Sequence, residues 1–422
     1  MMSSPADTAV PPSAPLQRGA WTALVALSLM FFLLMAGTFN SLGQVLPSMV
    51  KDLDMNWSQA GLGFALLGLA CGGASPLPAL GIRWLGVRTT LALGALVLAL
   101  SFAAMAVAGS ASVYYAGAFA LGVGFCLVGP IPAVDVLGSV FGARQSLAIG
   151  IYFAVGNVGA VCGPLMFYTV HQLTGGWRSY WLLWVAASIA VGAFAAIAAG
   201  NAAHAARRAG AEAAGTAVAR VPLRDLFRHM PLQFWVLAGA YTTCLAVDTI
   251  FHSFVFQHLM ERGVTQGLAT GAMSGAAAVA AIASALGGAA GQKLPARFLT
   301  IVSLLALAAS MVILTLPTGV ATVLGFVVAF GCGVGVCKVA VVEMLRGWFN
   351  DALLLELYAV MTWVATAAAL GPSVGGRLRD ATGTFAPIFD LSALGCVGIV
   401  ILLALVRRPR SSVVTDSPAI AA

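Results

Sequence analysis

The sequence predicts an all-α membrane protein with twelve transmembrane helices in two six-helix bundles. Two observations carry this prediction: a composition that a soluble protein could not sustain, and a skeleton of constrained residues that occurs twice. Of the 422 residues, 60% are hydrophobic and only 8% are charged, and the mean hydropathy is +0.97. So few charges would not keep a soluble chain of this length dispersed.

The apolar residues gather into segments of membrane-spanning length. A helix needs roughly 20 residues to cross the hydrocarbon core. The segment lengths and the Ala, Leu and Gly content favour helices over the short alternating strands of a membrane barrel. The expected spans are 21–46, 57–80, 89–109, 113–138, 146–170, 179–200, 233–256, 266–290, 298–316, 320–342, 353–376 and 386–406.

The two halves of the chain share a register of constrained residues at an offset of 208 positions. Glycine and proline mark places where the backbone is restricted, so their common spacing indicates a duplicated architecture. Internal repeats of membrane helices are typical of secondary transporters. The paired positions are Phe141 and Phe349, Gly163-Pro164 and Gly371-Pro372, Thr174-Gly175 and Thr382-Gly383, and the acids Asp135 and Glu343.

The longest polar interruption, 201–230, divides the expected spans six and six. It therefore marks the boundary between two bundles. We expect a disordered cytoplasmic tail over 1–20, an N-terminal six-helix bundle over 21–200, a cytoplasmic linker over 201–230, a C-terminal six-helix bundle over 231–407 and a cytoplasmic tail over 408–422.

The net charge of +7 could suggest a nucleic-acid-binding surface, but the basic residues are distributed as in a membrane protein. With both termini in the cytoplasm, fifteen Lys and Arg residues fall in inner segments and five in outer loops, which is a clear positive-inside bias. We expect a multi-pass protein of a bacterial-type inner (plasma) membrane. Its partners would be the lipid bilayer and a small-molecule substrate, and nucleic acid is not expected.

Other function classes lack their sequence signals. The seven cysteines lie in apolar segments without the paired spacing of a zinc or redox site, so no metal or cofactor is expected. No phosphate-binding G-x-x-x-x-G-K-[ST] loop is present, which argues against ATP-driven transport. No nucleophile with a matching base can be picked out by spacing, so an enzyme is not expected.

Two motifs carry a family resemblance. The loop after the second expected span reads Gly81-Ile-Arg-Trp-Leu-Gly86-Val-Arg88, which resembles the G-x-x-x-x-G-x-R/K signature of the major facilitator superfamily. The fifth expected span carries Gly150, Gly159 and Gly163-Pro164, similar to the fifth-helix motif of proton antiporters in that superfamily. The resemblance implies parallel six-helix repeats that rock about a central site, which is alternating access.

Three further pieces resemble the monocarboxylate carrier and oxalate–formate exchanger group. They are 56–60 at the start of the second span, 141–150 at the start of the fifth, and 376–385 after the eleventh. The carriers of this group place an acid and an arginine in helix eight, whereas the eighth span here has no ionisable residue. The charge of an anionic substrate would therefore have to be met elsewhere.

Ionisable side chains inside spans are costly and are functional candidates by default. Asp248 and His252 are four residues apart in the seventh expected span, so they share one helix face. A carboxylate in a low dielectric binds a proton more readily, and histidine titrates near neutrality. We interpret the pair as proton-coupling residues. The alternative is a neutral hydrogen-bonded pair that stiffens the helix.

Lys338 is the one basic residue inside an expected span. We interpret it as a positive anchor for an anionic substrate, with a snorkelling or gate-pairing lysine as the alternative. Uncharged polar residues in spans are weaker candidates for substrate contact, because each could instead bond a neighbouring helix. These candidates are Asn40, Gln44, Tyr152, Asn157, Tyr241 and Trp363.

Charged residues near the inner ends of the spans suggest a gate. We expect an ion-pair latch on the cytoplasmic side that holds the outward-open state and breaks when the bundles rock. Its candidate members are Asp135, Arg144, Glu343, Arg346, Arg83 and Arg88.

Together these residues predict a secondary active transporter that takes up a small organic anion, such as a monocarboxylate, with a proton. One alternative is a proton-driven antiporter that exports an amphiphilic or cationic compound, which the fifth-span glycines and Asp248 favour. The anion-uptake and cation-export hypotheses differ in the role they give Lys338, because a cation exporter has little use for a buried positive charge. An alternative of another class is a membrane receptor or scaffold that has lost transport.

Overall fold

The computed structural model describes residues 18–210, 230–291, 293–317, 319–349 and 354–407. Within them the chain is helical almost throughout, as predicted. Eleven helices are long and apolar enough to cross a membrane, and a bent pair, Trp57–Gly73 with Leu77–Trp84, makes a twelfth span. Residues 1–17 of the expected N-terminal tail, the expected C-terminal tail and most of the expected linker lie outside the described residues. Residues 18–20, which were expected to be disordered, instead begin the first helix.

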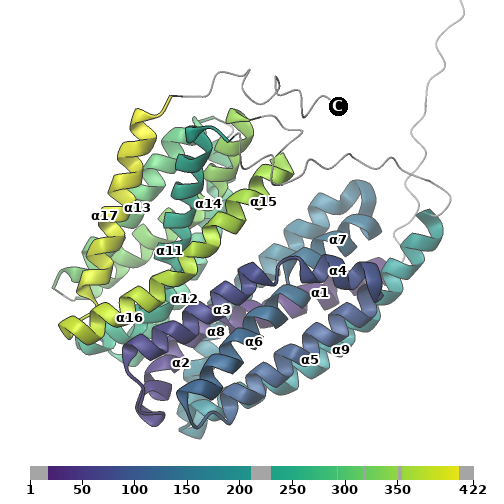
Figure 1. Ribbon diagram of the computed structural model, residues 1–422, viewed down its shortest axis with the longest axis horizontal. Coiled ribbons are helices and arrows are strands. Elements are labelled where there is room, and N and C mark those ends of the chain that lie inside the picture. Colours follow the sequence, from purple (N-terminus) through teal and green to yellow (C-terminus); the bar gives the residue numbers. More distant parts are fainter. Residues whose placement is uncertain (1–17, 211–229, 292, 318, 350–353, 408–422) are drawn as a thin grey trace, which may run out of the picture.

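In the described part of the first half of the chain (Figure 1) there are nine α-helices and one 3-10 turn. They are α1 (Arg18–Gly37), α2 (Phe39–Asp52), α3 (Trp57–Gly73), α4 (Leu77–Trp84), α5 (Gly86–Ala106), α6 (Ala111–Val128), α7 (Pro130–Phe141), η1 (Gly142–Arg144), α8 (Gln145–Thr174) and α9 (Trp177–Gly210). The last helix continues ten residues beyond the expected end of its span at 200, into the segment expected to be linker.

The second half repeats this plan. Its elements are α11 (Leu232–Glu261), α12 (Gln266–Gly291), α13 (Ala296–Thr315), α14 (Val320–Trp348), α15 (Leu354–Ala365), η3 (Thr366–Leu370), α16 (Gly371–Thr382) and α17 (Ala386–Leu405). Each half has its own cluster of buried apolar side chains, one drawn from 20–203 and the other from 234–403. Trp57 packs against both clusters.

Proline and glycine account for the breaks within spans. α3 and α4 meet at a bend of 48°, where Pro76 and Pro78 remove backbone donors and disfavour a continuous helix. α6 ends at Gly129, whose extended backbone precedes Pro130 at the start of α7. In the second half, a 3-10 turn precedes Gly371-Pro372.

The duplicated Thr-Gly pairs close equivalent helices in the same way. Gly175 ends α8 with φ 70° and Gly383 ends α16 with φ 76°, both left-handed. Their N–H groups donate to the carbonyl groups of His171 and Arg379 at 2.8 and 2.9 Å. Glycine adopts this conformation without a Cβ clash, which explains why the two copies keep it.

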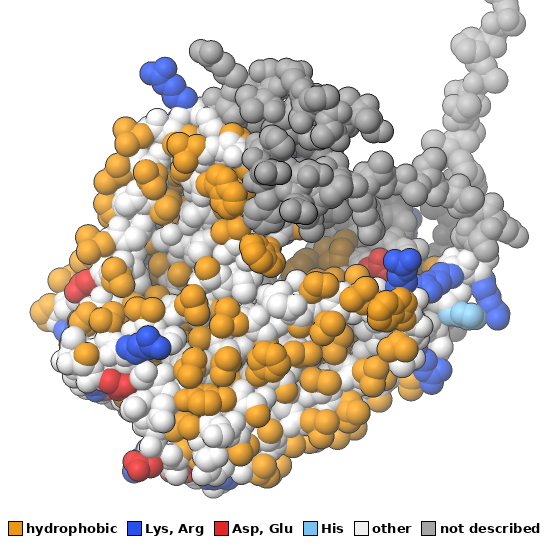
Figure 2. Space-filling model, viewed as in Figure 1, with side chains coloured by type: hydrophobic (Ala, Val, Ile, Leu, Met, Phe, Trp, Pro, Cys, Tyr) orange, Lys and Arg blue, Asp and Glu red, His pale blue; other side chains and the backbone are white. Residues whose placement is uncertain are grey.

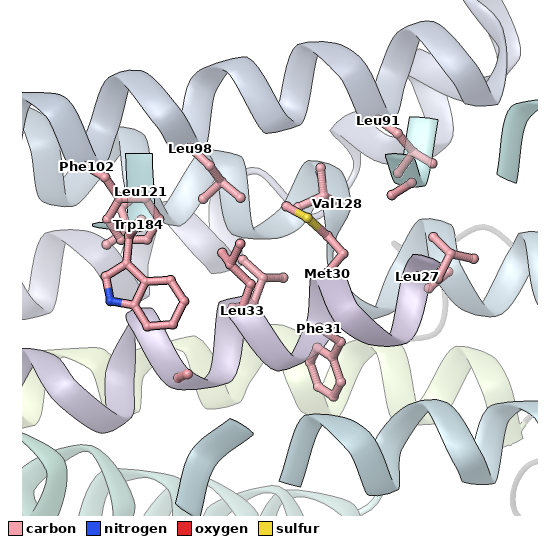
Figure 3. Packing of buried hydrophobic residues seen from close by; sticks show 14 of the residues in the cluster. Leu27, Met30, Phe31, Leu33, Leu91, Leu98, Phe102, Leu121, Val128 and Trp184 are labelled. Carbon is pink, nitrogen blue, oxygen red and sulfur yellow. The ribbon is translucent and has the colours of Figure 1, made fainter. Parts of the chain in front are cut away.

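The core of the first half is built around α1. Figure 3 shows Leu27, Met30 and Leu33 of this helix facing apolar side chains of α5, α6 and α9. On the outer surface, apolar side chains cover the middle of the molecule in Figure 2, while charged side chains gather toward its ends. A broad apolar belt between charged ends is the surface expected of a multi-pass membrane protein.

Candidate functional site

A cavity of about 1040 Å³ lies between the two helical bundles. Residues of α1, α2, α3, α6, α7 and α8 line it from one half, and those of α11, α12, α14, α15 and η3 line it from the other. The lining is predominantly apolar and aromatic, with a small number of polar groups. A largely apolar cavity with a few convergent polar groups is the usual form of a small-molecule site.

The bundles meet at one end of this cavity, which we call the closed end. It carries the turns at 53–56 and 383–385, and there α3 packs along η3 and α16, α2 along α11, and α8 along α12. Toward the opposite, open end the bundles diverge, and α7 and α15 lie well apart in Figure 1. In Figure 2 the surface is hollowed between the two lobes on that side.

Glycines permit the close approach at the closed end. Gly43 of α2 lies against the backbone carbonyl group of His252, and Gly61 of α3 lies against that of Pro372. Neither position has room for a Cβ atom. Small residues at helix interfaces let backbones approach in this way in membrane proteins.

A charged pair forms the polar centre of the cavity wall. The Nζ atom of Lys338 in α14 lies 2.8 Å from Oδ2 of Asp248 in α11. The Nε2 atom of His252 lies 3.5 Å from Oδ1 of the same carboxylate. Among the described residues that line the cavity, Asp248 and Lys338 are the charged ones. The Lys338 side chain is 40% exposed and that of Asp248 is 17% exposed, so the lysine is the more accessible partner.

The His252 ring completes this cluster. Its Nδ1 atom is buried and makes no hydrogen bond to the described residues. The ring also stacks edge-on against Phe251, whose ring lies 3.9 Å from that of Phe330. The carboxylate therefore sits between a cationic nitrogen and an imidazole, beside an aromatic wall. Lys338 donates a hydrogen bond to the carboxylate, whereas the His252 ring lies close to it without a hydrogen bond.

The neutral candidates divide into two sets. Asn40, Asn157, Tyr241 and Trp363 all line the cavity. The Tyr241 hydroxyl lies 3.3 Å from that of Tyr358, and 65% of Trp363 is exposed. The Asn40 amide group donates to the carbonyl oxygen of Met35 at 2.7 Å.

Gln44 and Tyr152 are not among the residues that line the cavity. Gln44 is buried at the closed end, where its Nε2 donates to Thr270 Oγ1 of the other bundle at 2.6 Å. Tyr152 is fully buried and its ring stacks on Phe31 at 4.6 Å. Their expected role in substrate contact therefore has no geometric support, and Gln44 instead joins the two bundles.

The expected gate residues lie outside the cavity lining. The side chains of Arg83, Arg88, Asp135 and Arg144 are exposed. Glu343 and Arg346 belong to one helix, α14, and pair with each other at 3.7 Å. Under the expected topology, with both termini in the cytoplasm, the closed end would face outward, whereas the expected latch would hold an outward-open state. The latch stays a prediction.

Sequence inspection missed several cavity residues, among them Tyr358 and Thr249. It also missed a signal in the repeat itself. Asn40 and Gln44 lie 208 positions before Asp248 and His252, so the polar pair of α2 is the counterpart of the titratable pair of α11. Equivalent helices of the two bundles thus carry equivalent polar faces, one neutral and one ionisable.

Two bundles of six membrane spans around a cavity closed at one end form the architecture of secondary transporters. The model of the Major Facilitator Superfamily matches residues 27–342. The chain belongs to the major facilitator superfamily, a family of transporters and not of enzymes. Secondary transport is therefore its general activity, and the protein is a multi-pass membrane protein.

The fold is also shared with a solved transporter structure. The crystal structure of the nucleoside transporter NupG, in a mutant form, superposes with a TM-score of 0.73 over 90% of this chain and 99% of that chain. The two sequences are 13% identical, so the likeness concerns the fold. No curated protein sequence was found to match the chain.

Proposed function

We propose that the protein is a proton-coupled transporter that takes up a small organic anion, such as a monocarboxylate, by alternating access. It would act in a bacterial-type inner membrane with both termini in the cytoplasm, as the charge distribution favours. The observation that carries the proposal is the Lys338–Asp248 ion pair at 2.8 Å on the cavity wall. A lysine held there is a binding group for a carboxylate, and its present partner is a carboxylate.

Charge balance supports coupling between the anion and a proton. In the empty site the ammonium and carboxylate groups neutralise each other. A substrate carboxylate that binds Lys338 displaces Asp248, which would then be an unpaired charge in a poorly hydrated wall. Such a charge is costly. A proton on Asp248 removes this cost, so anion and proton are most stable in the site together.

His252 provides a route for that proton. Its Nε2 atom already lies 3.5 Å from the Asp248 carboxylate, and an imidazole can accept a proton at one nitrogen and release one from the other. We assign it a relay role between the cavity and Asp248.

A proton-driven exporter of an amphiphilic or cationic compound is the second candidate. The aromatic lining, including Phe251, Phe330 and Trp363, favours it. The ion pair argues against an exporter of cations, because Lys338 would repel a cation that approached Asp248.

The test is uptake of a panel of radiolabelled monocarboxylates into proteoliposomes, with and without an inward proton gradient. Wild type, Lys338→Ala and Asp248→Asn would be compared, with Lys51→Ala as control because Lys51 is an exposed lysine at a helix end. We expect gradient-driven uptake in wild type and control, and loss of at least tenfold in Lys338→Ala. Asp248→Asn should lose gradient stimulation. Absence of uptake for every carboxylate would overturn the anion proposal and favour the exporter.

A further inference from the structure

The first turn of α3 is capped by a side chain from the other bundle. Oδ1 of Asp380 accepts a hydrogen bond from the backbone N–H of Trp57 at 3.0 Å, and Oδ2 accepts one from that of Ser58 at 2.7 Å. Asp380 lies near the end of α16, more than 320 residues away along the chain. These contacts join the two bundles at the closed end.

Local capping provides acceptors for only some of the backbone N–H groups at the start of α3. Asn56 Oδ1 accepts from the N–H of Gln59 at 2.8 Å, and Gln59 Oε1 accepts from the N–H of Asn56 at 3.0 Å. This reciprocal capping box belongs to one bundle and does not depend on the other. The first two N–H groups of α3 have no acceptor within the helix, so their partner is the Asp380 carboxylate.

The surrounding packing brings Asp380 within reach. Gly376, one turn before Asp380, lies against the backbone carbonyl group of Trp57 with no room for a Cβ atom. The Trp57 ring packs edge-on against Phe385 and Phe254 of the second bundle, with ring centroids 5.1 and 6.3 Å apart. An aromatic and backbone contact thus positions a short acidic side chain at the helix terminus.

Other acids at this end bind within their own bundle. Asp52 accepts from Trp177 Nε1 at 2.8 Å and pairs with Arg178 at 3.3 Å, all in the first bundle. Glu261 pairs with Arg379 at 2.9 Å, both in the second. Asp380 instead crosses the interface, where its charge also faces the positive end of the α3 dipole.

We propose that Asp380 is a gating residue whose carboxylate holds the closed end shut by capping α3 across the interface. When the bundles separate at this end, the N–H groups of Trp57 and Ser58 lose their acceptors together and must be hydrated instead. Opening is therefore linked to the entry of water at this end. The proposal concerns the conformational cycle and does not depend on which substrate is carried.

A native cysteine allows a direct test, because Cys71 lines the cavity and is partly exposed. Membrane vesicles would be treated with a membrane-impermeant maleimide on the closed-end face or on the opposite face, and modified residues located by mass spectrometry. The variants are Asp380→Ala and Asp380→Asn, which keeps one acceptor oxygen without the charge. Asp54→Asn is the matched control, since Asp54 is an exposed acid three residues before Trp57.

We expect Asp380→Ala to speed modification of Cys71 from the closed-end face about tenfold. This ratio corresponds to roughly 1.4 kcal/mol, which lies within the range for a partly buried charge at a helix terminus. Asp380→Asn should fall between it and wild type, and Asp54→Asn should match wild type. Two results would overturn the proposal: unchanged rates in both Asp380 variants, or an equal increase in Asp54→Asn. The second would mean that overall charge at this end, and not the cap, controls opening. This readout needs no substrate, so it is independent of the uptake test.

Discussion

Gly43 of α2 lies against the backbone carbonyl group of His252 in α11, with no space between them for a side chain. α2 and α11 are equivalent helices of the two bundles, and they cross at this point. His252 also belongs to the charged cluster on the cavity wall. The contact that shuts one end of the cavity is therefore made by the backbone of a residue whose side chain faces the ion pair.

We predict that Gly43→Ala destabilises the closed end. A Cβ atom at this position forces α2 away from α11, and such overpacking costs about 1–3 kcal/mol. Thermal unfolding in detergent should show a lower midpoint, and maleimide should reach the cavity faster from the closed-end face. Gly150→Ala is the control, because a Cβ atom there meets open space. Equal behaviour of the two variants would show that the α2–α11 contact does not restrain the closed end.

The Lys338–Asp248 pair should show strong non-additivity in stability. Removing one partner leaves the other charge without its counter-ion, which costs about 3–5 kcal/mol for a fully buried pair. We expect less here, about 1–3 kcal/mol, because 40% of the Lys338 side chain is exposed. Thermal unfolding of Lys338→Met, Asp248→Asn and the double variant would measure this. The double variant should be more stable than the sum of the single changes predicts, and simple additivity would argue against a direct pair.

Tyr152→Phe should leave transport unchanged, in contrast to the substrate contact expected from sequence. The hydroxyl group of Tyr152 is buried and makes no hydrogen bond to the described residues. Its removal relieves an unsatisfied polar group and should leave stability equal or raise it by up to about 1 kcal/mol. Tyr241→Phe is the matched comparison, since the Tyr241 hydroxyl lines the cavity near Tyr358. A large loss of transport in Tyr152→Phe alone would restore the original interpretation.

Thr270→Val should weaken the contact between the bundles at the closed end. The change keeps the side-chain shape but leaves Gln44 Nε2 without its acceptor at 2.6 Å. A buried donor left unsatisfied costs about 1–3 kcal/mol. Adding Gln44→Leu should recover part of this loss, because both polar partners are then absent. A melting temperature for Thr270→Val equal to that of wild type would mean that the hydrogen bond contributes nothing net.

Sequence patterns predicted the fold because they depend on local physics. A span must satisfy its backbone hydrogen bonds internally and stay apolar, so length and composition reveal it. The repeated Thr-Gly pairs could be recognised in the sequence for the same reason, because a left-handed helix end, as at Gly175 and Gly383, favours glycine wherever it occurs. The neighbourhood of Asp248 and His252 also followed from spacing, because residues four apart share a helix face.

The sequence by itself determined the number of spans, the duplication and the ionisable residues that had to find partners in the membrane. Only the tertiary structure decided which partners these were. Lys338 reaches Asp248 across 90 positions of chain, and Asp380 reaches the start of α3 across more than 320. The tertiary structure also placed Gln44 between the bundles and Tyr152 in a buried core. Helix spacing fixes neighbours within one helix, whereas contacts between helices depend on how two bundles pack, which no local pattern encodes.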